Sequence, residues 1–314
     1  MAKDKTKVRT KKGWTKDDTE LAIMALPTTV WYLLFSYLPM FGIIIAFKKF
    51  KISGGFLNSL WTSEFVWFDN FKFLFQSRDT PLIIRNTLAY GITFVIVGTF
   101  LPLAAAIAIN YLHSKKMAKV YQTMMFLPHF LSWVVVSALV LAFLTYDKGV
   151  INNMIANFGG DRVQWYMKPS FWPPFLVFMS IWKGLGNGMI VYLATLTGID
   201  KTYYEAACID GATIWQQIRY VTIPLMRSVI ILLLIMRVGG IFATDFGLFY
   251  QVPRDSNSLY TVVYTWDVFV YKQLRSSTTG MASAAAMLQS VLSCIMILST
   301  NAIVRKVDSE SAMI

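Results

Sequence analysis

Long apolar stretches alternate with shorter polar segments along the whole chain. Six of them stand out, at about residues 19–47, 83–112, 120–145, 171–198, 223–249 and 279–304. Each is longer than the roughly 20 residues that a helix needs to cross a hydrocarbon core about 30 Å thick. Because lipid offers no hydrogen-bond partners, each stretch must satisfy its own backbone groups as a helix. The pattern predicts an all-α integral membrane protein with six transmembrane helices in one domain, residues 19–304.

The polar segments predict how these helices are oriented. A basic tail, residues 1–18, precedes the first apolar stretch, and a short tail, residues 305–314, follows the last. The first apolar stretch is too long for the core of a cleaved signal peptide. With six spans both tails lie on one side of the membrane, and that side carries Lys and Arg at roughly twice the density of the other. The pattern therefore predicts both termini in the cytoplasm.

Composition supports a membrane protein and narrows its partners. Of the 314 residues, 56% are hydrophobic and 15% are charged, whereas a soluble domain carries about 25% charged residues. The net charge of +12 fits basic residues that flank membrane spans and face anionic lipid, so no nucleic-acid partner is expected. The two cysteines and two histidines lack the spacing of metal ligands, so no metal site is expected either.

The polar segment between the fourth and fifth apolar stretches carries signals for two short helices. Thr202, followed three residues later by Glu205, has the pattern of a capping box and predicts a helix start. Gly211 permits a break or a close backbone approach. Thr213 and Gln216 have the spacing to cap a second helix. The segment thus predicts two cytoplasmic helices that meet at a glycine.

One motif in this segment is typical of a family. Glu205-Ala206-Ala207 is followed after three residues by Gly211 and about nine residues later by Val221-Thr-Ile223-Pro224. This pattern resembles the Glu-Ala-Ala loop of permease subunits in binding-protein-dependent bacterial ABC importers, where the last part reads Ile-x-Leu-Pro. Other stretches resemble the polysaccharide and oligosaccharide branch, which serves carbohydrate uptake: residues 37–48, 126–136, 181–188, 198–200 and 204–217.

The resemblance implies a type I importer permease of the MetI-like fold in the bacterial cytoplasmic (plasma) membrane, with a coupling helix in the loop 199–222. It implies a second permease subunit, usually a homologous but different chain, and two ABC ATPase subunits that bind ATP and Mg. An extracytoplasmic solute-binding lipoprotein would deliver the oligosaccharide, and this chain would hold no cofactor. Coupling to the ATPase is expected at seven positions: Glu205, Ala206, Ala207, Asp210, Gly211, Ile218 and Pro224.

The chain lacks the motifs of a catalytic subunit. It contains no Gly-x-x-x-x-Gly-Lys-Ser/Thr phosphate loop, and its glycine-rich run 184–188 lies in an apolar stretch rather than between a strand and a helix. It also has no Gly-x-Ser-x-Gly motif and no carboxylate pair placed to flank a glycosidic bond. The sequence therefore predicts a non-catalytic permease subunit of a transport ATPase.

Ionisable residues inside apolar stretches are costly and are candidates for function. Here these are Lys183 in the fourth stretch and Arg237 and Asp245 in the fifth. The last two are eight residues apart, so a continuous helix would place them on one face. They could pair with each other, pair with the partner subunit, or line the path of a sugar. Because sugars bind through hydrogen bonds and aromatic stacking, the candidate path also includes Trp182, Asn187, Tyr192, Phe246 and Gln289.

Other interpretations stay open. The same fold could import a different solute, such as a glycerophosphodiester or a peptide. An ion-coupled secondary transporter would use Lys183, Arg237 and Asp245 as a relay, but inverted repeats would then be expected, and the loop motif would be unexplained. A membrane-bound enzyme would need a catalytic constellation that the sequence does not show.

Overall fold

The computed structural model describes residues 15–51, 54–276 and 278–307. Within them the chain is helical, apart from loops and a short antiparallel pair of strands, β1 (Lys48–Lys49) and β2 (Glu64–Phe65). The α-helices are α1 (Lys16–Tyr32), α2 (Phe56–Thr62), α3 (Asp69–Gln76), α4 (Thr80–Asn110), α5 (Lys115–Phe126), α6 (Trp133–Leu144), α7 (Val150–Asn157), α8 (Trp172–Thr197), α9 (Lys201–Ile209), α10 (Ile214–Gln217), α11 (Ile223–Leu225), α12 (Arg227–Gly239), α13 (Tyr260–Val263), α14 (Trp266–Arg275) and α15 (Thr279–Val307). Shorter 3-10 helices are η2 (Leu38–Phe47), η3 (Leu127–Phe130), η4 (Trp165–Met167), η5 (Pro169–Phe171) and η8 (Asn257–Leu259), and π-helices are η1 (Leu33–Tyr37), η6 (Ile218–Thr222) and η7 (Gly247–Gln251).

Helices that are long and apolar enough to cross a membrane make up most of the described chain. Two of the candidate spans are pairs of helices bent at a short break, by 98° between Lys115–Phe130 and Trp133–Leu144 and by 67° between Ile214–Leu225 and Arg227–Gly239. If each bent pair counts as one span, the described residues hold six candidate spans. The four continuous ones are Lys16–Phe47, Thr80–Asn110, Pro169–Thr197 and Thr279–Lys306.

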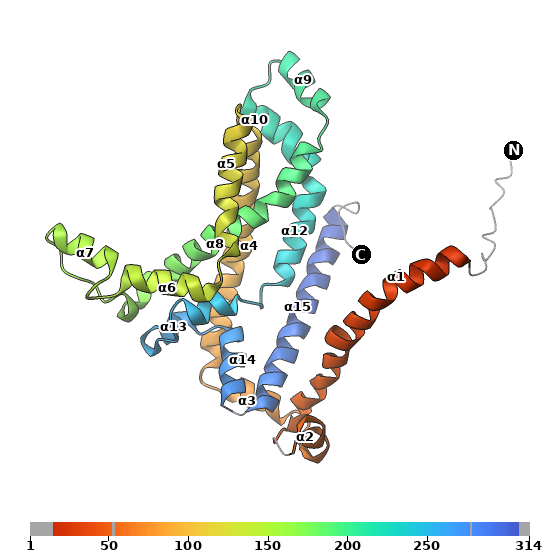
Figure 1. Ribbon diagram of the computed structural model, residues 1–314, viewed down its shortest axis with the longest axis vertical. Coiled ribbons are helices and arrows are strands. Elements are labelled where there is room, and N and C mark those ends of the chain that lie inside the picture. The colour runs from red at the N-terminus through yellow and green to blue at the C-terminus, as the bar shows by residue number, and fades with distance from the viewer. Residues whose placement is uncertain (1–14, 52–53, 277, 308–314) are drawn as a thin grey trace.

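The break in the third apolar stretch has local causes. Pro128 lies in η3 and has no backbone N–H to continue an α-helix. Leu131 is then extended, and Ser132 starts α6 as its N-cap, where its hydroxyl accepts a hydrogen bond from the Val135 N–H at 3.3 Å. As a result α6 leaves the bundle at a large angle, and Figure 1 shows α6 and α7 projecting to one side.

The prediction of a continuous helix over residues 223–249 is wrong. The helical run begins earlier, at Ile214, and α12 ends at Gly239 with Gly240 as its C-cap. Two successive glycines weaken a helix, and the chain then finds other partners. The Thr244 N–H and hydroxyl donate to the Asp267 carboxylate at 2.6 and 2.8 Å, so the backbone leaves the helix before residue 245.

The core of the bundle forms where α4 and α8 pack side by side. One buried cluster lies around Leu176 and Phe249, and a second lies around Met189 and Tyr192. Close packing of α8 depends on Gly186, because a Cβ there would collide with the Met125 backbone. At this point close helix-to-helix contact depends on a small residue, as is usual in membranes.

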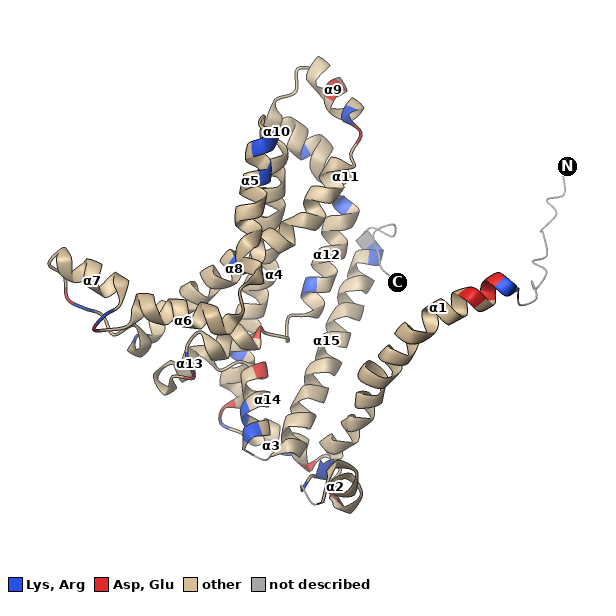
Figure 2. Ribbon diagram, viewed as in Figure 1, with Lys and Arg blue, Asp and Glu red and all other residues tan. Residues whose placement is uncertain are grey.

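The first span, by contrast, is barely covered by the rest of the chain. α1 has no buried residue, and Figure 1 shows it running away from the bundle. Its C-terminal continuation η2 does pack against α15. Figure 2 shows long uncharged stretches on α1, α4 and α15, with basic and acidic residues mostly toward helix ends and loops. This distribution is typical of helices surrounded by lipid or by other membrane helices.

Candidate functional site

The loop formed by α9 and α10 lies at one end of the bundle (Figure 1). Its first helix begins differently from the prediction. Asp200 is the N-cap, and its Oδ1 accepts hydrogen bonds from the Thr202 N–H at 3.0 Å and hydroxyl at 2.5 Å. These two bonds hold the pKa of Asp200 below its usual value. The predicted capping box of Thr202 and Glu205 is therefore wrong, since the nearer carboxylate takes the hydroxyl and Glu205 stays exposed.

The predicted glycine break is confirmed. Gly211 adopts φ +77°, the left-handed region in which a side chain is strained. The Ala212 N–H reaches back to the Ala207 carbonyl at 2.9 Å, which closes the end of α9. The predicted second cap is also confirmed. The Thr213 hydroxyl accepts from the Gln216 N–H at 3.4 Å, and the Gln216 Oε1 accepts from the Thr213 N–H at 2.7 Å.

Side-chain hydrogen bonds hold the two helices of the loop together. Gln217 is buried, and its Nε2 donates to the Ala212 carbonyl at 3.2 Å. The hydroxyls of Tyr204 on α9 and Thr222 on η6 lie 3.0 Å apart. These bonds join α9 to the start of the fifth span.

The outer surface of this loop is apolar. Ile209 is 87% exposed and Trp215 is 79% exposed, and Tyr203, Ile214 and Tyr220 are also exposed. Large exposed apolar side chains grouped on one loop mark a protein-binding surface. Sequence reasoning missed these five residues. The signal that could have found them is the presence of large apolar side chains between polar ones in a short loop.

Most of the seven predicted coupling residues are accessible to a partner. Five of them are exposed, namely Glu205, Ala206, Asp210, Gly211 and Pro224. The other two, Ala207 and Ile218, are half-buried.

The candidate path residues lie within the bundle, and the first of them, Lys183, stands at the break of the third span. Its Nζ donates to the His129 carbonyl at 2.9 Å and lies 5.3 Å from the centre of the Trp133 ring. The carbonyl is available because the chain leaves the helix just after η3. The ammonium thus satisfies a backbone carbonyl at the break.

The second, Asp245, is not on one helix with Arg237, and that prediction is wrong because α12 ends between them. Its Oδ2 accepts from the Trp133 Nε1 at 2.6 Å, and its Oδ1 accepts from the Gly247 N–H at 3.0 Å. Asp245 therefore holds α6 against the start of η7. Sequence reasoning missed Trp133, for which no signal was available, since the two residues are 112 positions apart.

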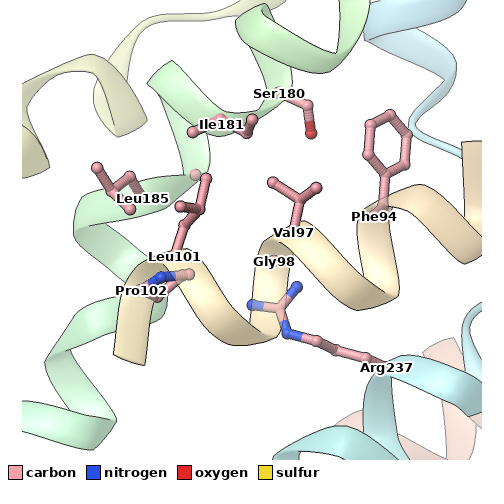
Figure 3. A pocket seen from close by; sticks show the side chains of 10 residues that line it. Phe94, Val97, Gly98, Leu101, Pro102, Ser180, Ile181, Leu185 and Arg237 are labelled. Atoms are coloured by element: carbon pink, nitrogen blue, oxygen red, sulfur yellow. The ribbon is translucent and has the colours of Figure 1, made fainter. Parts of the chain in front are cut away.

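The third, Arg237, reaches into a cavity of about 90 Å³ between α4, α8 and α12. Figure 3 shows its guanidinium beside Gly98 of α4, with Ser180 of α8 across the cavity. A Cβ on Gly98 would lie 2.5 Å from the Arg237 Nη1, and one on Gly188 would lie 3.3 Å from the Nη2. The two glycines thus make the space that the guanidinium occupies.

The five remaining candidate path residues do not gather at one place in the structure. Gln289 donates to the Phe242 carbonyl at 3.0 Å and to the Asp267 Oδ1 at 3.1 Å. Asp267 itself was missed because it lies outside the apolar stretches. Tyr192 is buried, and its hydroxyl has no hydrogen-bond partner within the described part of the chain. The other three stand apart: Phe246 stacks on Tyr250 at 4.9 Å, Trp182 lines an apolar groove, and Asn187 is exposed on α8.

Comparison with known proteins adds the family to this geometry. Residues 98–309, more than half of the chain, match the family described as "Binding-protein-dependent transport system inner membrane component". The chain belongs to this family. It is 34% identical to Protein LplB of Bacillus subtilis (strain 168), over 94% of this chain and 91% of that protein. It is 31% identical to the polygalacturonan/rhamnogalacturonan transport system permease protein YteP of the same organism, over 92% and 89%.

A solved structure agrees with this family in sequence and in shape. A chain in the crystal structure of a bacterial ABC transporter involved in the import of the acidic polysaccharide alginate superposes with a TM-score of 0.82. The two are 34% identical, and the match covers 93% of this permease and 97% of that chain. The predicted MetI-like, all-α membrane fold is confirmed, and the permease is a multi-pass protein of the bacterial inner membrane. The cytoplasmic placement of both termini stays a prediction.

Proposed function

We propose that this permease is one of two membrane subunits through which separate ATPases drive the import of oligosaccharides. Its relatives include permeases of sugar transport systems. The solved neighbour was also crystallised with a periplasmic protein that carried an alginate pentasaccharide. An extracytoplasmic binding protein is accordingly the source of substrate for this chain. Import of oligosaccharides is favoured over import of peptides or glycerophosphodiesters and over ion-coupled transport.

The observation that carries the coupling role is the α9–α10 loop. Internal hydrogen bonds hold the loop together, its outer surface carries exposed apolar side chains, and it continues directly into the fifth span. A rigid apolar projection of this kind inserts into a groove of a partner protein. We assign that partner as an ABC ATPase that binds ATP and Mg, while this chain performs no catalysis. Motion of the ATPase then tilts the loop and, through Thr222 and η6, the helices around the path.

A second permease subunit completes the path in this proposal. α1 offers an apolar surface that the described residues of its own chain leave uncovered, and a homologous chain would cover it by helix packing. The path itself runs beside the broken helices near Lys183, Trp133 and Asp245, because irregular backbone inside a membrane occurs where it lines a cavity or is buried in protein.

The coupling role is tested by Gly211→Ala, with Gly198→Ala as the matched control. A Cβ at Gly211 is strained by the positive φ, whereas at Gly198 its closest contact is an ordinary one of 3.4 Å. The full importer is reconstituted in proteoliposomes, and ATP hydrolysis and oligosaccharide uptake are measured together. A side chain at residue 211 makes the left-handed conformation roughly 1–2 kcal/mol less favourable. Because the loop then adopts its coupling shape less often, Gly211→Ala should lower the uptake per ATP about tenfold. Equal coupling ratios in the two variants would contradict the proposal.

Glu205→Ala provides a second test that separates docking from folding. Glu205 caps nothing in this structure, whereas the Thr202 hydroxyl bonds to the N-cap Asp200. If Glu205 contacts the ATPase, Glu205→Ala lowers coupled uptake more than Thr202→Ala does. The reverse order would assign the effect to the stability of α9 and not to the partner.

A further inference from the structure

Arg237 carries a charge that the described part of the chain does not balance. Within these residues its guanidinium makes no hydrogen bond and no ion pair. An arginine inside a membrane-spanning helix is costly and is retained where it meets a partner or a water-filled path. Among the described residues Asp245 forms no ion pair with Arg237; its carboxylate instead accepts hydrogen bonds from Trp133 and from the Gly247 N–H.

Asp267, the acidic residue that binds the end of the fifth span, forms no ion pair with Arg237 among the described residues either. Asp267 accepts hydrogen bonds from Thr244 and Gln289. The counter-charge of Arg237 is therefore expected from outside the described chain.

The space around Arg237 is shaped for a small polar group. The cavity of about 90 Å³ is lined by apolar side chains of α4 and α8, with Ser180 as a second polar side chain. That volume is several times what one water molecule requires, and a carboxylate group fits it. Gly98 and Gly188 leave the guanidinium accessible from the cavity, and Arg237 is half-buried. Figure 3 shows the two polar side chains, Arg237 and Ser180, on different sides of the same space.

We propose that Arg237 binds a carboxylate of the transported sugar, so that the permease selects acidic oligosaccharides built with uronic acids. The planar guanidinium presents paired N–H donors that match the two oxygens of a carboxylate. Ser180 offers a hydroxyl to the sugar on the other side of the cavity. The apolar walls strengthen this charge pair by excluding water. The inference rests on the proposed function and adds its substrate class.

A carboxylate of the second permease subunit is the competing partner for Arg237. It would also neutralise the charge, but it would occupy the cavity in every state, with or without sugar. The two possibilities therefore differ in whether Arg237 is reachable in the sugar-free importer.

Chemical protection of Arg237 tests this directly and needs no transport. The purified full importer is treated with phenylglyoxal, and modification is mapped by mass spectrometry at Arg237 and at exposed Arg78 as an internal control. Tetragalacturonate should slow modification of Arg237 about tenfold, as expected for a charge-assisted pair, and should leave Arg78 unchanged. The carboxyl-reduced tetrasaccharide should protect neither.

Three results would overturn the proposal. Equal modification with and without tetragalacturonate would show that no carboxylate binds there. Slow modification of Arg237 in the sugar-free importer would show that a partner subunit's carboxylate already covers it. Equal protection by the acidic and the neutral tetrasaccharide would leave a sugar path but remove the selection of acidic sugars.

Substitutions then connect binding to uptake. Arg237→Gln should abolish the binding of tetragalacturonate, measured as its affinity for the importer. Arg78→Gln should leave that affinity unchanged. Arg237→Lys should keep part of the affinity, because the charge remains and the fork is lost. If Arg237→Gln binds tetragalacturonate as well as the unsubstituted importer does, the assignment of Arg237 is wrong. The proposed function has its own test in the Gly211→Ala coupling ratio, which does not depend on sugar charge.

Discussion

The α9–α10 loop and the Arg237 cavity are the two candidate binding surfaces of this permease, and they are built over very different sequence distances. The loop is closed by bonds between residues at most 18 positions apart, as with Tyr204 and Thr222. The cavity joins α4, α8 and α12, and the bond from Trp133 to the candidate path residue Asp245 spans 112 positions. The comparison teaches that the proposed surface for a protein partner is defined locally, whereas the proposed surface for a solute depends on how the spans pack.

The largest expected effect concerns the packing of the spans. Gly186→Val should lower the free energy of unfolding by about 3 kcal/mol, because its side chain would collide with the Met125 backbone and overpacking of this kind is not absorbed by rotamer changes. Thermal unfolding of the purified protein in detergent measures it. Gly184→Ala is the control, since a Cβ there meets nothing within 4 Å. Similar unfolding temperatures for both variants would show that the contact of α8 with Met125 is not required.

The next effect concerns the segment that interrupts the fifth span. Asp267→Ala should destabilise the fold by about 2 kcal/mol, since Thr244 and Gln289 lose a charged acceptor. Amide exchange over residues 240–245 should rise in parallel with a lower unfolding temperature. Asp161→Ala removes the same charge from an exposed loop position and should change neither. Unchanged exchange in Asp267→Ala would mean that the two glycines alone end α12.

A smaller effect separates the loop from the cavity. Thr213→Ala should cost about 1 kcal/mol through loss of the cap of α10, seen as faster amide exchange at Ile214–Gln217. Thr213→Ser keeps the hydroxyl and should restore protection. Because the loop is local, exchange in α4 and α12 should not change. A change there would show that the two regions are coupled in the resting protein.

The smallest effect is a pH dependence at the start of α9. The pKa of Asp200 is lowered by hydrogen bonds from Thr202, so the charged cap stabilises the helix above the ordinary Asp pKa of about 3.9 and this contribution is lost as pH falls through the lowered value. The protection of the Thr202 amide, which is its exchange rate relative to the intrinsic rate at the same pH, should therefore fall below about pH 4. In Asp200→Asn, which also caps well, this loss of protection should be absent. A loss of equal size in Asp200→Asn would assign it to another group.

Local patterns were sufficient for much of the fold and part of the candidate site. The six apolar stretches, the turn at Gly211 and the cap of Thr213 by Gln216 all depend on neighbouring residues. The capping box at Thr202 failed for a local reason, since Asp200 competes for the same hydroxyl. The shared face of Arg237 and Asp245 failed for a non-local one, because Asp267 draws Thr244 out of the helix.

The sequence by itself determined that this is a helical membrane protein, where its apolar spans lie, and which loop carries the motif of an importer permease. Hydrophobic length and backbone hydrogen bonding in lipid leave no other solution for such stretches. Only the tertiary structure decided which partners the charged groups find: Asp245 accepts from Trp133, Lys183 donates to the His129 carbonyl, and Arg237 has no hydrogen bond or ion pair within the described chain. Those outcomes depend on where broken helices come together, and a one-dimensional pattern does not encode that position.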